Sequence, residues 1–199
     1  YTHAWSGNHD LWENGKEIFR EGEYFPDLML EYTEKFLEEE GEDPFFMYWA
    51  INIPHYPVQG EPKWLDHYRD LPSPRKEYAA FVSSMDEKVG ELVKLLEERG
   101  LLENTLIIFQ ADHGYSKEEI AGGGGGSAGV YRGSKFSLFE GGVRVPTFVT
   151  WEGHIQADKV EDCLVTNIDW FPTLAELCGL TLPDRKLDGK SMLPLLQGK

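Results

Sequence analysis

Hydrophobic positions along the chain recur at helical spacing in several segments, and these segments predict the helices. A helix is predicted over residues 76–99, where apolar side chains form one stripe and Gly100 follows the last turn. Residues 25–40 predict a second helix, because Leu28, Tyr32 and Phe36 recur every four residues after Pro26 in the first turn. Further helices are predicted over 169–178 and, shorter, over 191–196.

Between these helices lie short continuous apolar runs rich in aromatic and β-branched residues. Such runs are typical of strands buried on both faces. They cover residues 45–51, which we expect to form a parallel strand, and then 105–111 and 146–151. The order strand, helix, strand, strand, helix predicts an α/β fold, a layered βαβ sheet with flanking helices.

The remaining segments are predicted to be loops. Residues 1–22 are polar and aromatic, with at most a short strand pair, and residues 54–75 carry five prolines, which predicts an extended irregular loop. Residues 122–126 are all glycine, which indicates a flexible loop. Because no linker divides the chain, we expect residues 1–199 to form a single domain, although the sheet has few strands for this length.

Composition narrows the classes of partner. Hydrophobic residues make up 41% of the chain, as in globular proteins, and no run approaches a membrane span. The net charge of −16 argues against nucleic acid or an anionic membrane as a partner of the whole surface. It leaves an anionic small substrate possible, because one local cation can reverse the sign in a pocket. Cys163 and Cys178 lie among apolar residues, so we expect both to be buried free thiols.

Asp112 and His113 are the first candidates for chemistry, because they directly follow the apolar run 105–111. The carboxyl ends of strands in open α/β sheets are where ligands bind. A carboxylate and an imidazole can share a divalent cation, provided that the chain turns at Gly114 so that both reach it. Capping of the next turn by Asp112 is the structural alternative.

His55 and Lys135 are the other candidates. His55 follows the run 45–51 and lies between Pro54 and Pro57, which stiffen its loop. It can bind a ligand or simply bond to a backbone carbonyl. Lys135 lies in a glycine-flanked segment and offers a compact positive charge for an oxyanion, or alternatively an exposed partner for Glu140. Arg144 is interpreted as structural, paired with a buried acid.

Taken in order, these segments resemble the type I sulfatases of the alkaline-phosphatase-like superfamily. The resemblance covers most of the chain from about residue 10. The matching stretches are P-F-F-M-Y-W-A-I-N-I-P-H-Y-P (44–57), N-T-L-I-I-F-Q-A-D-H-G (104–114), Y-R-G-S-K-F-S-L-F-E-G-G-V-R-V-P (131–146), D-W-F-P-T-L-A-E-L (169–177) and L-D-G-K-S-M-L-P-L-L (187–196).

The resemblance implies hydrolysis of a sulfate monoester, on an aryl or carbohydrate group, with one calcium ion and a formylglycine. It implies that Asp112 and His113 are two calcium ligands, His113 standing where many members have Asn. It implies that His55 and Lys135 are catalytic and bind the sulfate while the leaving group departs. It also implies export of the protein to the periplasm, the lysosome or the exterior.

The sequence departs from the family in one large respect. Sulfatases make the formylglycine from Cys or Ser in C-x-P-S-R or a close variant, and neither cysteine here has that context. The early Asp-Asp calcium pair is absent too. We therefore expect a fragment of a catalytic domain that lacks an amino-terminal part and a carboxyl-terminal subdomain, and that is inactive alone. A non-catalytic binding protein of the same fold is the main alternative. A two-metal phosphoryl-transfer relative is disfavoured, because such a site needs further Asp and His ligands and His154 is the only histidine after the Asp112–His113 pair.

Overall fold

The computed structural model describes residues 9–41, 43–119 and 123–198. The chain divides into two compact units, which are described separately. The first comprises residues 1–99 and 110–147, and the second comprises residues 100–109 and 148–199. Within the described residues, no helix is both long enough and apolar enough to cross a membrane.

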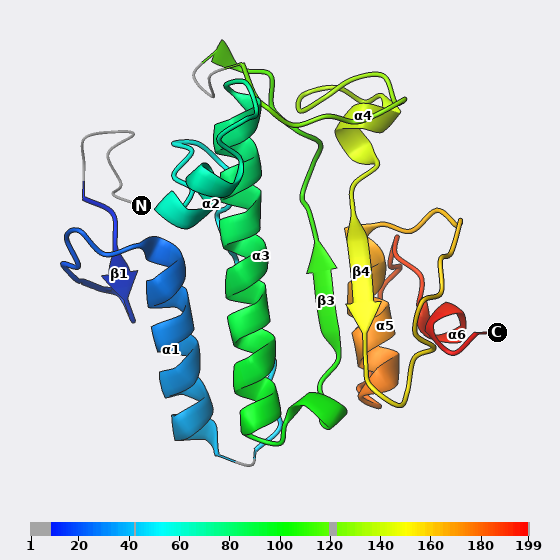
Figure 1. Cartoon of the computed structure of the whole chain (residues 1–199). Helices are drawn as coiled ribbons and strands as arrows, with labels where there is room; N and C mark the ends of the chain where they lie inside the picture. Colours follow the sequence, from blue (N-terminus) through cyan, green and yellow to red (C-terminus); the bar gives the residue numbers. More distant parts are fainter. Residues whose placement is uncertain (1–8, 42, 120–122, 199) are drawn as a thin grey trace. The chain divides into compact units, whose positions relative to one another are not determined.

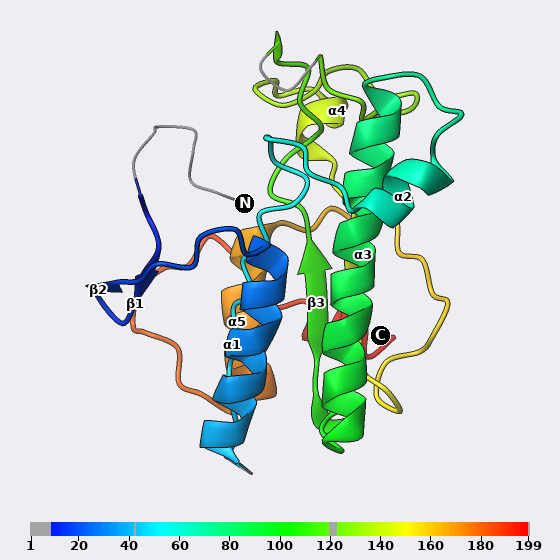
Figure 2. The same cartoon turned by 60° about the vertical axis from the view of Figure 1, so that its left-hand side comes forward.

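Two helices, α1 (Phe25–Glu40) and α3 (Arg75–Glu98), pack against each other in the first unit, as Figures 1 and 2 show. Both confirm the helices predicted from the apolar spacing. Pro26 occupies the first turn of α1, and Gly41 ends it with a φ of 63°. Their shared core contains the fully or nearly fully buried side chains Leu28, Leu37, Ala80, Phe81 and Leu96.

The proline-rich segment contains a helix that the sequence pattern did not predict, α2 (Pro62–His67). Pro62 stands at its first position, where a missing N–H costs nothing. The helix packs on α3. There Lys63 Nζ and Trp64 Nε1 both donate to the Glu87 carboxylate, at 2.6 and 2.9 Å. The loop prediction for 54–75 is therefore wrong at 62–67, because a proline that opens a helix was interpreted as a breaker.

The predicted strand over residues 45–51 is also wrong. The segment is not part of any sheet among the described residues, and side-chain exposure alternates along it, with Phe46 at 77% and Tyr48 at 84%. Its inward side chains pack on α1, where the Phe36 and Phe45 rings lie 5.9 Å apart. A strand needs a neighbour with which to exchange backbone hydrogen bonds. In the described parts of the chain, the backbone of 45–51 makes only the bond from Ile51 N to Trp49 O.

Two short strands near the amino terminus confirm the expected strand pair. Strands β1 (Trp12–Glu13) and β2 (Lys16–Glu17) pair antiparallel. Asn14 and Gly15 connect them with φ values of 50° and 76°, the backbone of a tight hairpin turn.

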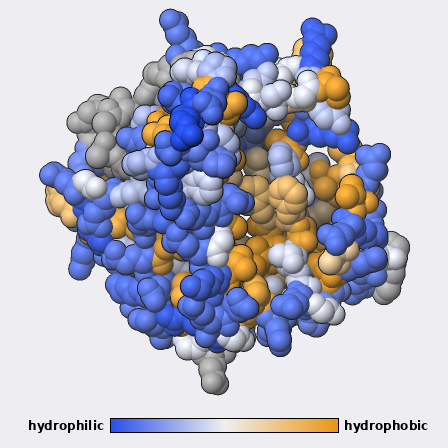
Figure 3. Space-filling model, viewed as in Figure 1, coloured by the Kyte–Doolittle hydropathy of each residue, from blue (hydrophilic) through white to orange (hydrophobic). Residues whose placement is uncertain are grey.

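The second unit contains most of the paired strands β3 (Ile107–Gln110) and β4 (Thr147–Thr150), whose arrows run in opposite directions in Figure 1. Both confirm predicted strands. The short 3-10 helix η1 (Leu102–Asn104) precedes β3. Apolar side chains reach the surface of both units, among them Phe46 in the first and Phe148 in the second. Figure 3 shows apolar residues, in orange, on the face that it draws.

The predicted helix over 169–178 is present as α5 (Trp170–Leu177), preceded by η3 (Asn167–Asp169) and followed later by α6 (Leu193–Leu196). The Asp169 carboxylate accepts hydrogen bonds from Thr166 N and Lys190 N, both at 2.8 Å, so it connects the start of α5 to the segment before α6. Both cysteines are free, as expected, but Cys163 and Cys178 are exposed rather than buried. The apolar residues around Cys163 are exposed too, with Leu164 at 95%.

Candidate functional site

All four predicted site residues belong to the first unit, and backbone hydrogen bonds join the loop of Asp112 and His113 to the segment of Lys135. Gly114 N donates to Gly142 O at 2.9 Å, and Lys135 N donates to Tyr115 O at 2.9 Å. These bonds join the loop that follows β3 to the segment that carries Lys135 and the short helix α4 (Glu140–Val143). A Cβ atom on Gly114 would overlap the carbonyl oxygen of Gly141, so the approach requires glycine.

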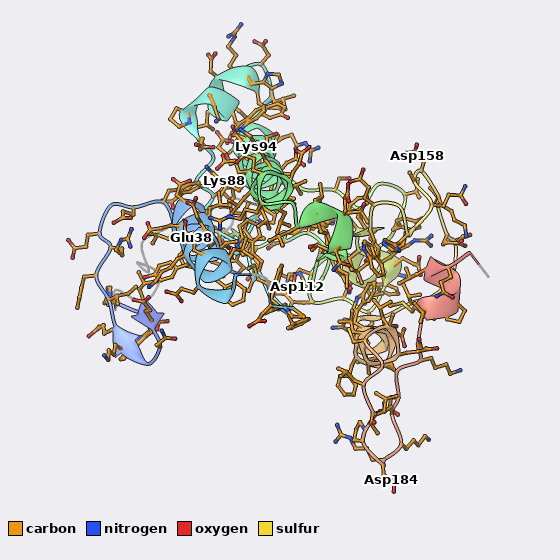
Figure 4. The ribbon with its side chains drawn as sticks, turned by 90° about the horizontal axis from the view of Figure 1, so that it is seen from below. Glu38, Lys88, Lys94, Asp112, Asp158 and Asp184 are labelled. Atoms are coloured by element: carbon orange, nitrogen blue, oxygen red, sulfur yellow. The ribbon has the colours of Figure 1, made fainter. Side chains whose placement is uncertain are left out.

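Asp112 and His113 lie against each other at the start of this loop. His113 Nε2 is 3.2 Å from Asp112 Oδ2, while Asp112 Oδ1 accepts the His113 backbone N–H at 2.9 Å. The chain thus turns as the shared-ion hypothesis required. Both side chains are accessible, at 85% for Asp112, which is labelled in Figure 4, and 41% for His113.

The protonation of His113 bears on whether a cation fits this pair. His113 Nδ1 is 2.9 Å from Gly114 O, and a carbonyl only accepts, so Nδ1 carries the proton. In the neutral ring, Nε2 then presents a lone pair to the Asp112 carboxylate. Two acceptors at this distance are stabilised by a positive charge that both contact, either a proton on Nε2 or a metal ion.

Calcium fits Asp112 better than it fits His113. Calcium prefers six to eight oxygen ligands, so the Asp112 carboxylate suits it, and the His113 ring nitrogen would be the weaker ligand of the pair. Within the residues that the structure describes, no group of three or more His, Cys, Asp or Glu side chains could hold a metal ion. The pair therefore offers a partial ligand set.

Lys135 is largely shielded from solvent, with 12% of its side chain exposed. Its ammonium lies 3.0 Å from Glu118 Oε2, and Ser116 Oγ donates to the same oxygen at 3.0 Å. The pairing of Lys135 with Glu140 that the sequence left open is not formed. Glu140 pairs instead with Arg144, at 3.1 Å, and 58% of the Glu140 side chain is exposed.

Glu118 is the functional neighbour that sequence reasoning missed. Its hydrogen bond with Lys135 holds the pKa of the Glu118 carboxyl below its usual value, with further lowering by Ser116 and, through its charge, by His55. The carboxylate is therefore ionised at neutral pH and pairs directly with Lys135, one of the two predicted sulfate-binding residues. No motif marks it, because only the folded loop brings it to Lys135.

His55 lies beside the same cluster. Its Nδ1 is 2.8 Å from Tyr56 O, which places the proton on Nδ1 and leaves Nε2 accessible on an exposed ring. The carbonyl bond of the structural alternative is thus present, and it also orients the ring. The centroids of the Tyr56 and His55 rings lie 4.3 Å apart. Lys135 Nζ lies 5.8 Å from the Tyr56 ring centroid. The Tyr56 ring therefore lies between His55 and Lys135, and Lys135 also pairs with Glu118.

A surface hollow in the second unit is lined by residues of the α5 region, among them Pro172, Leu180 and Arg185. It contains none of the four predicted residues. The clustering of the predicted residues, and not this hollow, identifies the candidate site.

Comparison with known proteins adds an independent line of evidence. The model of the family described as Sulfatase matches residues 2–180. Human steryl-sulfatase is 44% identical over 126 residues, covering 61% of this chain and 22% of that protein. Human N-acetylgalactosamine-6-sulfatase is 37% identical over 158 residues, covering 78% of this chain and 29% of that protein. The chain thus spans between a fifth and a third of these curated relatives.

A solved structure shows the same fold. The crystal structure of Ps i-CgsB in complex with k-i-k-neocarrahexaose superposes with a TM-score of 0.82 at 34% identity. The match covers 91% of this chain and 40% of that one. The α/β, alkaline-phosphatase-like fold class is thereby confirmed. Because the family model matches residues 2–180 of this chain, the chain belongs to the sulfatase family.

Proposed function

We propose that this chain forms part of the catalytic domain of a sulfatase and takes part in hydrolysis of a sulfate monoester. In this proposal His55 and Lys135 bind the sulfate, and Asp112 with His113 holds the calcium ion. The observation that carries the proposal is the Lys135 side chain, which is only 12% exposed and lies, like the His55 ring, beside the Tyr56 ring. The family membership supports the reaction class.

In this proposal Lys135 binds the non-bridging oxygens of the sulfate, and His55 acts on the bridging oxygen. A shielded ammonium is a point charge for the non-bridging sulfate oxygens, and its attraction is strengthened where water is excluded. His55 Nε2 is the accessible ring nitrogen, because Nδ1 donates to Tyr56 O. Once protonated, it can donate that proton to the bridging oxygen as the leaving group departs.

Two further groups complete the proposed chemistry. Calcium, when bound, supplies positive charge beside the sulfate, and Asp112 with His113 contributes ligands to it. Formylglycine is the nucleophile that the family uses, and no C-x-P-S-R motif for it occurs among these 199 residues. The residues of this chain therefore bind and orient the ester and stabilise its departing oxygen.

A carbohydrate sulfate is the proposed substrate class. One relative is named for the 6-sulfate of N-acetylgalactosamine, and Ps i-CgsB was crystallised with a neocarrahexaose. Both point to sugars, whereas the steryl-sulfatase relative shows that the family also includes a protein named for sterol esters. Direct competition between sugar and aryl sulfates would separate these classes.

The 199-residue chain alone is expected to bind inorganic sulfate without turning over a chromogenic aryl sulfate. Binding follows from Lys135 and His55, and the lack of turnover follows from the missing nucleophile motif. Sulfate titration followed by NMR, alongside an absorbance assay, tests both. Aryl sulfate turnover that chelation abolishes would contradict the expected inactivity, and unchanged spectra at high sulfate would contradict the site.

Asp112→Asn is expected to weaken calcium binding by about tenfold or more, because one ligand charge is lost. Isothermal titration with calcium chloride measures it. Asp158→Asn is the matched control, since Asp158 is also exposed and has a φ of 55° that asparagine tolerates. Equal calcium affinities in wild type and Asp112→Asn would remove Asp112 from the ligand set.

A further inference from the structure

Phe136, the residue directly after Lys135, has an unusual backbone conformation. Its φ is 70°, in the left-handed region. For a residue with a Cβ this conformation is sterically unfavourable, and a bulky aromatic residue there is rare. Glycine would avoid the cost at the same position.

The contacts of Phe136 in the folded protein do not offset this conformational cost. Its side chain is 83% exposed, so it gains little from burial. Its ring centroid lies 5.0 Å from Lys135 Nζ, a cation–π distance. A cation–π contact at an exposed site is weak, so it does not exceed the backbone cost. Strained residues that the fold does not require cluster at ligand sites.

The position of Phe136 relative to Lys135 indicates what it could contact. The Tyr56 ring is the other aromatic group near the ammonium, with its centroid 5.8 Å from Nζ. An anion held by Lys135 would therefore have aromatic surface beside it, and Phe136 provides the more exposed part of that surface. Exposed aromatic rings next to a charged group are suited to ligands with a charged end and a flat apolar face.

We propose that Phe136 is a specificity-determining residue that packs against the ring of the leaving group, while Lys135 takes the sulfate. This inference rests on the proposed function. The ligand chemistry is a sulfate ester whose organic part is a six-membered ring with an apolar face. A sugar ring and an aryl ring both satisfy this description, so the experiment includes one of each.

The test compares three probes: inorganic sulfate, N-acetylgalactosamine 6-sulfate and 4-nitrophenyl sulfate. Their affinities for the full 199-residue chain are measured by NMR titration with calcium present. In Phe136→Gly, the affinity for at least one ring ester is expected to fall roughly threefold to tenfold, as for loss of one aromatic contact. The affinity for inorganic sulfate is expected to stay within about twofold, since Lys135 is intact. Which ester loses affinity identifies the sugar or aryl ring as the partner.

Two further variants keep the result interpretable. Phe136→Asn also tolerates the left-handed conformation and should give the same pattern as Phe136→Gly. Leu138→Ala removes an equally exposed apolar side chain, at 95%, from the same segment and should change no affinity. Thermal unfolding should show Phe136→Gly to be no less stable than wild type, because glycine relieves the backbone.

The outcomes separate the two proposals. Unchanged affinity for both ring esters in Phe136→Gly, or an equal loss for esters and inorganic sulfate, would overturn the role of Phe136 while leaving the sulfate site intact. A wild-type chain that binds no inorganic sulfate would overturn the proposed function, and the role of Phe136 with it.

Discussion

Gly114→Ala is expected to destabilise the protein by about 3 kcal/mol and to disrupt the candidate site. The added Cβ would overlap Gly141 O and approach Gly142 Cα, so backbone rather than a movable side chain must yield. The same movement would break the bond from Gly114 N to Gly142 O. Because this bond joins the loop carrying Asp112 and His113 to the segment carrying Lys135, both halves of the site should be displaced.

Urea unfolding followed by circular dichroism measures the change in free energy of unfolding. Gly90→Ala is the matched control, because Gly90 lies exposed within α3 and a Cβ there meets nothing within 4 Å. It should stabilise the protein by about 0.5–1 kcal/mol through helix propensity. A Gly114→Ala protein as stable as wild type would show that the two segments separate without cost.

Lys135→Ala is expected to reduce the affinity for inorganic sulfate by roughly tenfold to a hundredfold, the range for loss of a charge-assisted hydrogen bond. The variant also leaves Glu118 without the cation that it pairs with at 3.0 Å. An uncompensated carboxylate would then face the anion, which adds repulsion to the lost attraction. The double variant Lys135→Ala with Glu118→Gln should therefore recover part of the affinity.

Sulfate titration by NMR measures these affinities, with Lys117→Ala as the control. Lys117 lies next to Glu118 in the loop that follows β3, but it is exposed, and its Nζ lies 5.3 Å from the Tyr115 ring centroid. Its removal changes the net charge equally and should alter the affinity by less than about twofold. Equal losses in the two single variants would indicate attraction by overall charge and not a defined site.

The local signals in the sequence predicted the elements that depend on them. Helix α3 follows from one apolar stripe, and α1 follows from its spacing together with Pro26 and Gly41. Strands β3 and β4 follow from short apolar runs. In these elements the apolar positions of the local pattern are the ones that face the protein interior, so they can be predicted without knowing the rest of the chain.

The elements that failed depend on contacts distant in sequence. Residues 45–51 have strand composition, but strand formation needs a partner that no local pattern reveals. Helix α2 opens with Pro62, which favours a first turn as much as it breaks a later one, and packing on α3 decides between them. The exposure of Cys163 likewise depends on how the segment around it folds.

The candidate site divides in the same way. The four residues with predicted roles could be located from motifs, because strand ends, glycines and prolines mark those positions in the sequence. Glu118 and Phe136 could not. Glu118 is identified by an ion pair across 17 residues, and Phe136 by a backbone angle that its residue type disfavours. The ion pair of Lys135 with Glu118 therefore could not be predicted from the sequence, because it depends on how the two loops fold.

The extended segment 45–51 has a practical consequence for work with this chain. It is seven residues long, carries no charge and no proline, and projects Phe46 and Tyr48 outward. Its backbone donors and acceptors are almost entirely unused within the described part of the molecule. Segments of this kind stack between copies into fibrils. Concentrated samples should therefore precipitate slowly and bind amyloid dyes, and a lysine in place of Tyr48 should keep them clear.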